Sequence, residues 1–266
     1  MTALSGTVLL TGASGGIGQA IARALHARGA QLVLSGRRTE VLEPLGRELG
    51  ARVIAADLGR REDVVALAAA AGDVDILIAN AALPGSGTFM ELQSLQIDTI
   101  LEVNLRAPIA LAHALVPGML ARGRGHVVFI SSLSGKAASP AASLYNATKF
   151  GLRGFSLGVR EDLHASGVSA SVVLPGFISE AGMFHDSGVK LPRGVGTKTP
   201  EEVADGVVRA IEQDRAEVVV APLGLRLGTD LAGLAPQFSA RMQRRLGGDR
   251  VARQMAAAQQ GALPGR

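Results

Sequence analysis

Tyr145 is the only tyrosine in the chain, and Lys149 follows it by four residues. On a helix, this spacing places both side chains on one face. A free tyrosine titrates near pH ~10, and a neighbouring ammonium favours the phenolate and so lowers the pKa. Such a pair can give a proton to a carbonyl that is being reduced, or take one from an alcohol that is being oxidised. The alternative is an ordinary pair on a helix surface.

A glycine-rich turn spans residues 11–18, with the sequence TGASGGIG, between a predicted strand and a predicted helix. Gly12, Gly16 and Gly18 suit a tight turn, a close approach of the backbone to a pyrophosphate, and close packing of helix on strand. The N–H groups and the dipole of a helix that begins near Gly16 favour phosphate. The turn therefore predicts a dinucleotide site, with a flexible loop as the alternative.

The end of the second predicted strand bears on the choice of cofactor. An NAD site often has an acidic residue here to bind the ribose 2′-hydroxyl, but this chain has Gly36, Arg37 and Arg38. Two arginines can bind a 2′-phosphate through charge-assisted hydrogen bonds. We therefore expect NADP(H) in preference to NAD(H), unless both arginines are solvated residues at the start of a helix.

The elements that must position these residues alternate along the chain. Several short apolar runs are continuous in Val, Ile, Leu and Ala, which is typical of strands buried on both faces. The order predicts an α/β fold with a doubly wound, parallel, Rossmann-type sheet and helices on both faces. The predicted strands are 7–11, 31–35, 52–56, 74–80, 126–131, 169–174 and 217–221. The predicted helices are 16–28, 39–49, 61–71, 95–120, 144–165 and 200–213.

Length and composition set the broad class. The 266 residues suit one sizeable domain, and 47% hydrophobic with 3% aromatic residues predicts an aliphatic core. The absence of Cys excludes disulfides and thiolate metal sites, and we predict no metal site. We see no signal peptide and no continuous apolar run of about 18 residues. A cytoplasmic location is therefore the expectation.

Charge is concentrated at the C-terminal end. Residues 224–266 contain seven Arg and two Asp, a net of +5, whereas the whole chain has +4, so the remainder is near −1. A nearly neutral body argues against nucleic acid as a partner. We therefore divide the chain into a dinucleotide-binding and catalytic domain, 1–223, and a basic helical tail, 224–266, which is not an independent domain.

The tail has short apolar faces. Met242 and Leu246 are four apart, as are Val251 and Met255. These faces are expected to pack on the body or on another subunit, to lie on an acidic membrane surface, or to be disordered. The arginines around them are Arg241, Arg244, Arg245, Arg250 and Arg253.

Taken together, residues 5–222 resemble a short-chain dehydrogenase/reductase of the single-domain type. Each motif alone is modest, but their order and their places at strand ends are specific. The motifs are TGASGGIG at 11–18, Asp57-Leu58, Asn80-Ala81-Ala82, Asn104, Ser132, Tyr145 with Lys149, and Pro175-Gly176.

The resemblance implies roles for the proton-transfer residues. Tyr145 would be the proton donor or acceptor. Lys149 would lower its pKa and hold the hydroxyls of the nicotinamide ribose. Ser132 would bind the substrate oxygen. Asn104 would support a water that links Lys149 to solvent, although it could instead stabilise a helix bend.

The resemblance also implies a cofactor site. Asp57 would lie near the adenine, unless it is a helix N-cap, Asn80 and Ala81 would border the adenosine ribose, and Pro175-Gly176 would face the nicotinamide. The cofactor-binding residues expected are Gly12, Ser14, Gly16, Ile17, Gly18, Arg37, Arg38, Asp57, Leu58, Asn80, Ala81, Tyr145, Lys149, Pro175 and Gly176.

The chain departs from the family pattern in two places. Ala82 stands where the family often has Gly, which would alter the turn above the nicotinamide. The stretch after Pro175-Gly176 often has a Thr that binds the carboxamide, but here it contains Ser179 and Glu180. A carboxylate is unexpected there, so we assign no carboxamide ligand.

The loop 176–199 is long and contains several apolar residues, which is typical of lids. It is expected either to cover an apolar alcohol or ketone substrate or simply to pack on the body. The resemblance alone implies a homodimer or homotetramer through the helices 95–120 and 144–165. Two rival functions are a dinucleotide-binding regulator without catalysis and a membrane-associated module that binds through the tail.

Overall fold

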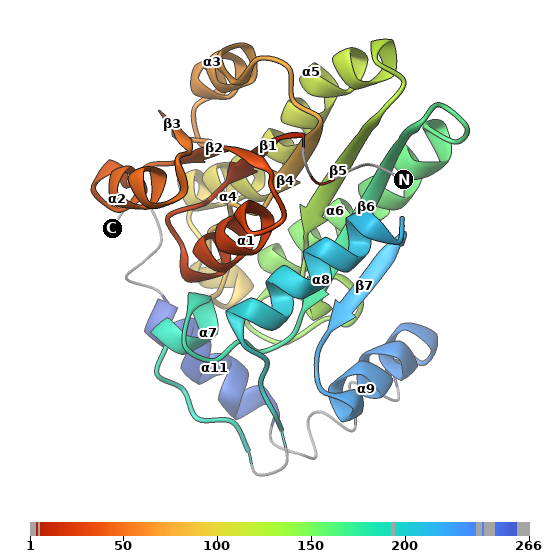
Figure 1. Cartoon of the computed structure of the whole chain (residues 1–266). Coiled ribbons are helices and arrows are strands. Elements are labelled where there is room, and N and C mark those ends of the chain that lie inside the picture. The colour runs from red at the N-terminus through yellow and green to blue at the C-terminus, as the bar shows by residue number, and fades with distance from the viewer. Residues whose placement is uncertain (1–3, 5, 193–194, 238–240, 242–247, 260–266) are drawn as a thin grey trace.

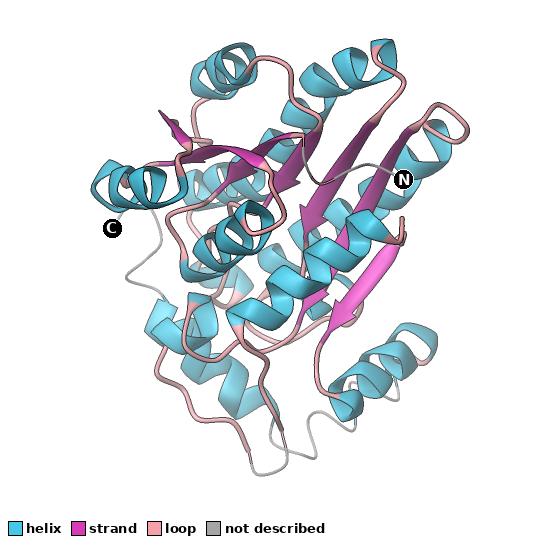
Figure 2. Cartoon of the chain, in the orientation of Figure 1, coloured by secondary structure: helices cyan, strands magenta, loops and turns pink. Residues whose placement is uncertain are grey.

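The computed structural model describes residues 4, 6–192, 195–237, 241 and 248–259, and within them seven parallel strands form one sheet. The strand order is β3-β2-β1-β4-β5-β6-β7, with helices on both faces (Figures 1 and 2). The central strands β4 and β5 are buried along their whole length. Strands of this kind need cover on both faces, and the predicted doubly wound α/β fold is confirmed.

The predicted elements occur with shifted ends. The strands are β1 Thr7–Thr11, β2 Gln31–Gly36, β3 Arg52–Ala55, β4 Ile76–Ala79, β5 Gly125–Ile130, β6 Val168–Pro175 and β7 Glu217–Val220. The main helices are α1 Gly16–His26, α2 Thr39–Leu49, α3 Arg61–Ala71, α4 Ser94–Leu101, α5 Ala107–Ala121, α6 Ser143–Asp162, α7 Gly182–Asp186, α8 Pro200–Glu212, α9 Leu223–Leu234 and α11 Gly248–Gln259. The loop 176–199, expected to be irregular, contains the short helix α7.

Two aliphatic layers hold the helices on the sheet. Helices α1, α2 and α8 bury Ile21, Leu42 and Val207 in the cluster on one face. Helices α3 and α5 bury Leu67 and Leu111, with α6 beside them, in the cluster on the other face. Full burial of such a side chain contributes roughly 1.5–3 kcal/mol. The aliphatic core that the composition predicts is therefore what positions the strand ends.

The helix predicted over 95–120 is interrupted. A π-helical segment, η2 Glu102–Arg106, joins α4 to α5. Within the described part of the chain, Ser94–Ala121 is long and apolar enough to cross a membrane by length and composition alone, although we expected no such segment. It packs Leu111, Leu115 and Met119 into the sheet core, which is typical of a core helix.

The end of the molecule beyond the carboxyl ends of the strands carries α7, α9 and α11 (Figure 1). On α11, Val251 and Met255 are half-buried and Arg253 is exposed, which favours packing of this helix on the body. Of the other tail residues named above, Arg241 is exposed. Met242, Arg244, Arg245 and Leu246 lie outside the described residues, as does the side chain of Arg250.

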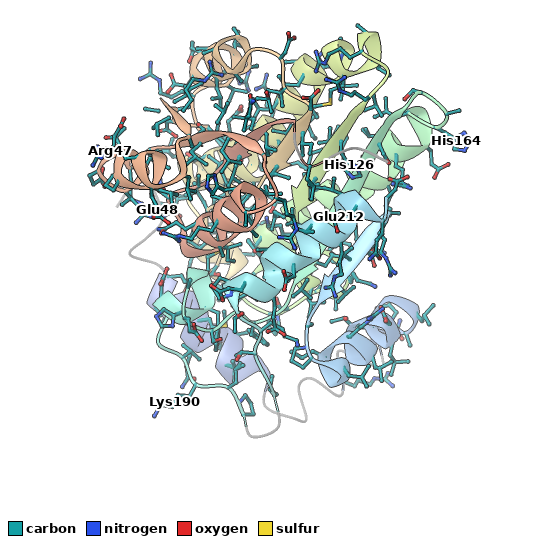
Figure 3. The ribbon with its side chains drawn as sticks, in the orientation of Figure 1. Arg47, Glu48, His126, His164, Lys190 and Glu212 are labelled. Atoms are coloured by element: carbon teal, nitrogen blue, oxygen red, sulfur yellow. The ribbon has the colours of Figure 1, made fainter. Side chains whose placement is uncertain are left out.

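A buried polar network lies towards the amino-terminal ends of strands β5 and β6, at the end of the sheet opposite these helices. His126 of β5 is 1% exposed, and its Nε2 lies 2.8 Å from Ser171 Oγ. Figure 3 shows His126 inside the fold and His164 at its surface. Ser171 Oγ donates its one proton to the Arg215 carbonyl at 2.6 Å, so His126 Nε2 is assigned as the donor to Ser171.

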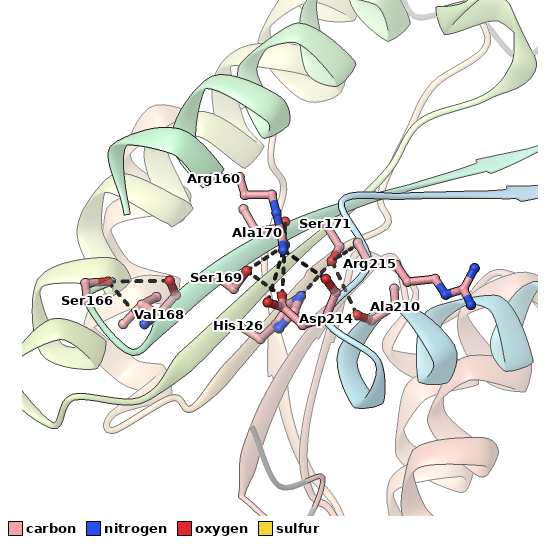
Figure 4. A network of polar contacts seen from close by, with 10 residues as sticks. All are labelled: His126, Arg160, Ser166, Val168, Ser169, Ala170, Ser171, Ala210, Asp214 and Arg215. Atoms are coloured by element: carbon pink, nitrogen blue, oxygen red, sulfur yellow. Dashed lines mark hydrogen bonds and ion pairs between the residues drawn. The ribbon is translucent and has the colours of Figure 1, made fainter. Parts of the chain in front are cut away.

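An ion pair lies beside the histidine. Arg160 binds both carboxylate oxygens of Asp214, at 2.8 and 3.0 Å (Figure 4). Burial lowers the pKa of His126 to about 4, with Asp214 acting to raise that pKa and Arg160 to lower it. The histidine is therefore neutral in the folded protein at physiological pH.

This shift makes folding stability depend on pH. Unfolded histidine titrates near ~6.5, so the unfolded chain takes up the proton first, and stability is lost as the pH falls from there towards about 4. The full loss corresponds to roughly 3 kcal/mol. We expect denaturant titrations across this window to show a flatter pH dependence for His126→Asn than for wild type. The exposed His164→Asn is the control, and an equal slope in all three proteins would contradict the assignment.

Candidate active site

The crevice between β1 and β4 lies where the sheet order reverses, the usual ligand position in such sheets. Gly12 follows β1 with φ +64°, and a Cβ there would lie 2.7 Å from the Ala81 Cα. A Cβ on Gly18 would lie 2.3 Å from the Gly12 carbonyl oxygen. Both positions require glycine, because any side chain would collide with backbone.

A threonine holds the two strand ends together. The Thr11 hydroxyl accepts hydrogen bonds from the backbone N–H groups of Asn80, at 3.1 Å, and Ala81, at 3.2 Å. The Asn80 amide donates to the carbonyls of Thr11 and Gly12, both at 3.1 Å. Asn80 is thus a clamp between strands, and its place beside the adenosine ribose stays a prediction. Our sequence reasoning did not assign Thr11, although its position at the strand end was a usable signal.

The start of α1 suits an anion. Gly15 at the N-cap has no side-chain capping bond, and the first turn, which includes Gly16 and Ile17, contains no acidic residue. The first-turn N–H groups have no partner within the helix, and they carry the positive end of the dipole. The glycine cradle and these donors together fit a dinucleotide pyrophosphate.

Arg38 lies against this turn. Its Nη2 donates to the Ser14 carbonyl at 2.7 Å, and its Nε donates to the Ser14 hydroxyl at 3.4 Å. Arg37 and Arg38 are both exposed at the end of β2. The structure thus brings a guanidinium to the mouth of the turn, where a 2′-phosphate would add a charge-assisted contact.

Asp57 follows β3 and caps a turn. Its Oδ1 accepts from the Gly59 N–H at 3.0 Å, and its own N–H donates to Asp63 Oδ2 at 2.9 Å. The N-cap of α3 is Arg60, so the alternative that Asp57 is the helix N-cap is wrong. Leu58 is buried in the core beneath it. The adenine role of Asp57 stays a prediction.

The predicted proton-transfer residues meet at the end of β5. Ser132 is the second residue after the strand, and its hydroxyl acts to lower the pKa of Tyr145, which lies in the first turn of α6. Lys149 is 2% exposed, with its Nζ 5.5 Å from the centre of the Tyr145 ring. The same Nζ donates to the Ile130 carbonyl at 3.0 Å. The fold therefore assembles all three predicted side chains.

Close backbone packing fixes α6 at this place. Ser131 Oγ donates to the Lys149 carbonyl at 2.9 Å. A Cβ on Gly135, in the short helix Leu133–Gly135, would lie 2.7 Å from both that carbonyl oxygen and Ser131 Oγ. Gly135 and Ser131 are positioning residues that the sequence pattern did not reveal.

Burial dominates the electrostatics of this group. It raises the pKa of Tyr145 to about 12, against the lowering effect of the Ser132 hydrogen bond. It also lowers the pKa of Lys149 to about 8. Burial outweighs the effect of Ser132, and the ammonium of Lys149 donates to the Ile130 carbonyl. The lowering of the Tyr145 pKa by Lys149 stays a prediction. A neutral phenol is suited to donate a proton.

Asn104 lies in the π-helical segment and is 1% exposed. Its Oδ1 accepts from the Leu83 N–H at 2.7 Å, and its Nδ2 donates to the Leu83 carbonyl at 2.8 Å. Both ends of the amide therefore hold the segment that follows β4 to the irregular helix. This supports the helix-bend alternative, and the proton-relay role stays a prediction.

The loop after β6 rests on the glycine-rich turn. Its first residue, Gly176, donates to the Val220 carbonyl at 2.9 Å directly after Pro175. A Cβ on Gly16 would lie 2.3 Å from the Ala181 Cβ, so glycine is needed there for the loop to approach. The loop thereby borders both the turn and the strand ends.

Ser179 and Glu180 lie in the stretch where the resemblance leads us to expect a Thr. Ser179 Oγ donates to the Lys198 carbonyl at 3.2 Å, so this hydroxyl serves the loop itself. Glu180 has φ +67° and lines a groove of about 480 Å³ between α1 and α8, which Tyr145 does not line. Neither side chain is directed to the proton-transfer residues by any contact that we observe.

Ile178 of the loop is buried in the core, whereas the apolar residues Phe177, Met183 and Phe184 are half-buried. The rings of Phe177 and Phe184 are 5.0 Å apart between centres and tilted by 56°. Met183 on α7 is half-buried. These half-buried apolar side chains belong to the loop that borders the glycine-rich turn and the strand ends, which suits a cover over an apolar substrate.

Comparisons with known proteins agree with this geometry. The short chain dehydrogenase family profile matches residues 6–190. Ketoacyl reductase HetN of Nostoc sp. is 39% identical over 230 residues, 83% of this chain and 80% of that protein. Dehydrogenase/reductase SDR family member 7B of Xenopus tropicalis is 35% identical over 251 residues, 86% of this chain and 81% of that protein. A solved short-chain dehydrogenase from Sphingobium yanoikuyae in complex with NADPH aligns with a TM-score of 0.75 at 30% identity, covering 91% of this chain and 95% of that one.

The titration of Tyr145 can be measured directly, because the chain has one tyrosine and no tryptophan. Phenolate absorbance should stay absent through pH ~10, where a free tyrosine is half ionised, since burial raises the pKa to about 12. Ser132→Ala should raise the pKa further by removing the hydrogen bond that lowers it. Half-ionisation below pH ~10 in the folded wild type would refute this account of the site.

Proposed function

The chain belongs to the short-chain dehydrogenase/reductase family and is an NAD(P)-dependent oxidoreductase, and on that premise we propose that it interconverts an apolar carbonyl compound and its secondary alcohol with NADP(H). The observation that carries the proposal is the grouping of Tyr145 with the buried Lys149, whose Nζ lies 5.5 Å from the centre of the Tyr145 ring, and with Ser132 at the carboxyl end of β5. A bound nicotinamide cofactor supplies or accepts the hydride.

The chain's own residues account for the proton. Tyr145, held neutral by burial, donates its phenolic proton to the carbonyl oxygen during reduction. Ser132 holds that oxygen through its hydroxyl. The phenolate that results lies beside Lys149, whose positive charge stabilises it. Oxidation of the alcohol runs the same transfer in reverse.

The preference for NADP(H) is supported by the positive edge of the site. Arg38 is held against the glycine-rich turn by two contacts with Ser14, and Gly36 offers no carboxylate for a ribose hydroxyl. The Sphingobium yanoikuyae structure named above is a complex with NADPH. These observations favour a 2′-phosphate over a free hydroxyl.

A catalytically silent regulator is not favoured, because the assembled proton-transfer group has no use in a protein that only binds the cofactor. The apolar loop around Phe177 and Phe184 supports an apolar substrate. A homodimer or homotetramer and a cytoplasmic location stay predictions from the sequence.

The cofactor preference is tested by fluorescence titration with NADPH and NADH. Arg38→Ala should weaken NADPH binding by roughly tenfold or more, the value of a charge-assisted hydrogen bond, and should leave NADH binding nearly unchanged. The matched control is Arg47→Ala. Arg38 is the N-cap of α2, and Arg47 lies in the last turn of that helix (Figure 3). Tighter binding of NADH by wild type, with no effect of Arg38→Ala, would reverse the cofactor preference and keep the fold.

The role of Tyr145 is tested by Tyr145→Phe in a screen of apolar ketones with NADPH. Loss of the proton donor should lower kcat by roughly 10²–10⁴-fold. NADPH affinity should change little, because the ring stays in place. A variant that keeps the wild-type rate would show that the proton comes from another group.

A further inference from the structure

The C-terminal helix α11 ends in a glutamine that joins two separate segments. Gln259 is 7% exposed. Its Oε1 accepts a hydrogen bond from Ser86 Oγ at 2.5 Å, and its Nε2 donates to the Met183 carbonyl at 2.9 Å. One buried amide thus has its acceptor satisfied by one segment and its donor satisfied by another.

The first of these segments lies against Tyr145. A Cβ on Gly85 would lie 2.9 Å from the Tyr145 backbone nitrogen and 3.1 Å from its Cβ. The Gly87 N–H donates to the Ala141 carbonyl at 2.8 Å, just before α6. Ser86 therefore stands between two residues that are fixed to the start of the catalytic helix.

The second segment lies against the cofactor turn. Met183 belongs to α7, and the preceding residues touch the turn: a Cβ on Gly182 would lie 3.5 Å from Ile17 Cδ1. Ala181 likewise approaches Gly16. The Gln259 side chain therefore connects the segment that borders Tyr145 to the segment that borders the glycine-rich turn.

The remainder of α11 is consistent with a helix that has one face on the body. Ala256 is buried, and Val251, Ala252 and Met255 are half-buried, whereas Arg253, Gln254, Ala257 and Ala258 are exposed. Over residues 251–259, the inner face of the helix is apolar apart from Gln259. Figure 1 shows α11 beyond the strand ends, on the same side as α7.

We propose that α11 is a wall of the substrate site and that Gln259 is a positioning residue that fastens it across the two segments. The proposal rests on the proposed function, since it assigns a cover to the same site. Fastened, the helix limits the access of water to Tyr145, which is half-buried, and limits the space for substrate. Released, it opens a path to Tyr145 for solvent and for larger substrates.

The lone tyrosine provides the test. Because the chain has no tryptophan, its intrinsic emission comes from Tyr145, and quenching of that emission by acrylamide measures access to the site. Gln259→Ala should raise the quenching constant by about twofold or more, as local opening exposes the ring. Gln254→Ala, on the exposed face of the same helix, should behave as wild type. Equal quenching in wild type and Gln259→Ala would overturn the proposal.

A second variant guards against a folding defect. Ser86→Ala removes the hydrogen bond from Ser86 to Gln259 and leaves the sequence of α11 unchanged, so it should also raise the quenching constant. In the double variant, the increase in the quenching constant should be smaller than the sum of the two single increases. Additive effects would show that the two residues act separately and would contradict the proposal that the hydrogen bond between them fastens α11. Far-ultraviolet circular dichroism confirms that each variant is folded.

Kinetics separate fastening from chemistry. With an apolar ketone that the wild type reduces, Gln259→Ala should raise KM roughly three- to tenfold with a smaller change in kcat, and NADPH affinity should be unchanged. An equal loss in kcat and kcat/KM, without a change in quenching, would place Gln259 elsewhere. Failure of wild type to bind NADPH would refute the proposed function, whereas the quenching experiment would still decide whether α11 covers Tyr145.

Discussion

The structure depends on how closely the ends of β1 and β4 approach each other at the point where the strand order reverses. The Thr11 hydroxyl takes two backbone donors from the start of the loop after β4, and Asn80 returns two donors to the end of β1. This exchange leaves no room for a side chain at Gly12, and the backbone of the turn leaves none at Gly18. The same closeness makes the first turn of α1 available to an anion, so packing and cofactor recognition arise from one constraint.

The predicted proton-transfer group shows how burial sets the protonation of its side chains. Desolvation acts in opposite directions on the two residues, because it disfavours the anionic phenolate of Tyr145 and the cationic ammonium of Lys149. The result is a phenol that keeps its proton and an ammonium that is easier to discharge. Ser132 and the Ile130 carbonyl hold these side chains in place, and the packing of Gly135 on α6 holds their backbones.

The amino ends and the carboxyl ends of the parallel strands are surrounded by different kinds of contact. At the amino ends, His126, Ser171 and the Arg160–Asp214 pair form a network of short hydrogen bonds between strands and turns. At the carboxyl ends, the loop 176–199, the segment around Ser86 and the C-terminal helix meet through single side chains such as Gln259. A rigid scaffold with function on its loops is the usual division.

Much of this protein was determined by local pattern. The continuous apolar runs predicted the strands because burial on both faces leaves a direct trace in composition. The turn 11–18 could be recognised from the sequence because it lies within one strand–turn–helix unit. The pair of Tyr145 and Lys149 could be recognised because the two residues are about one helical turn apart. The α/β fold, the cofactor class and the proton-transfer residues were predicted in this way.

The tertiary structure decided what depends on distant neighbours. Asn104 serves Leu83, which is 21 residues away, and Ser86 reaches Gln259 across 173 residues, and no local pattern marks either pair. The raised pKa of Tyr145 is also a tertiary effect, because the four-residue spacing shows the neighbouring lysine but not the burial of the phenol. Desolvation and long-range hydrogen bonds are set by the folded environment, and therefore the sequence determined which groups are present while the structure determined their protonation and their partners.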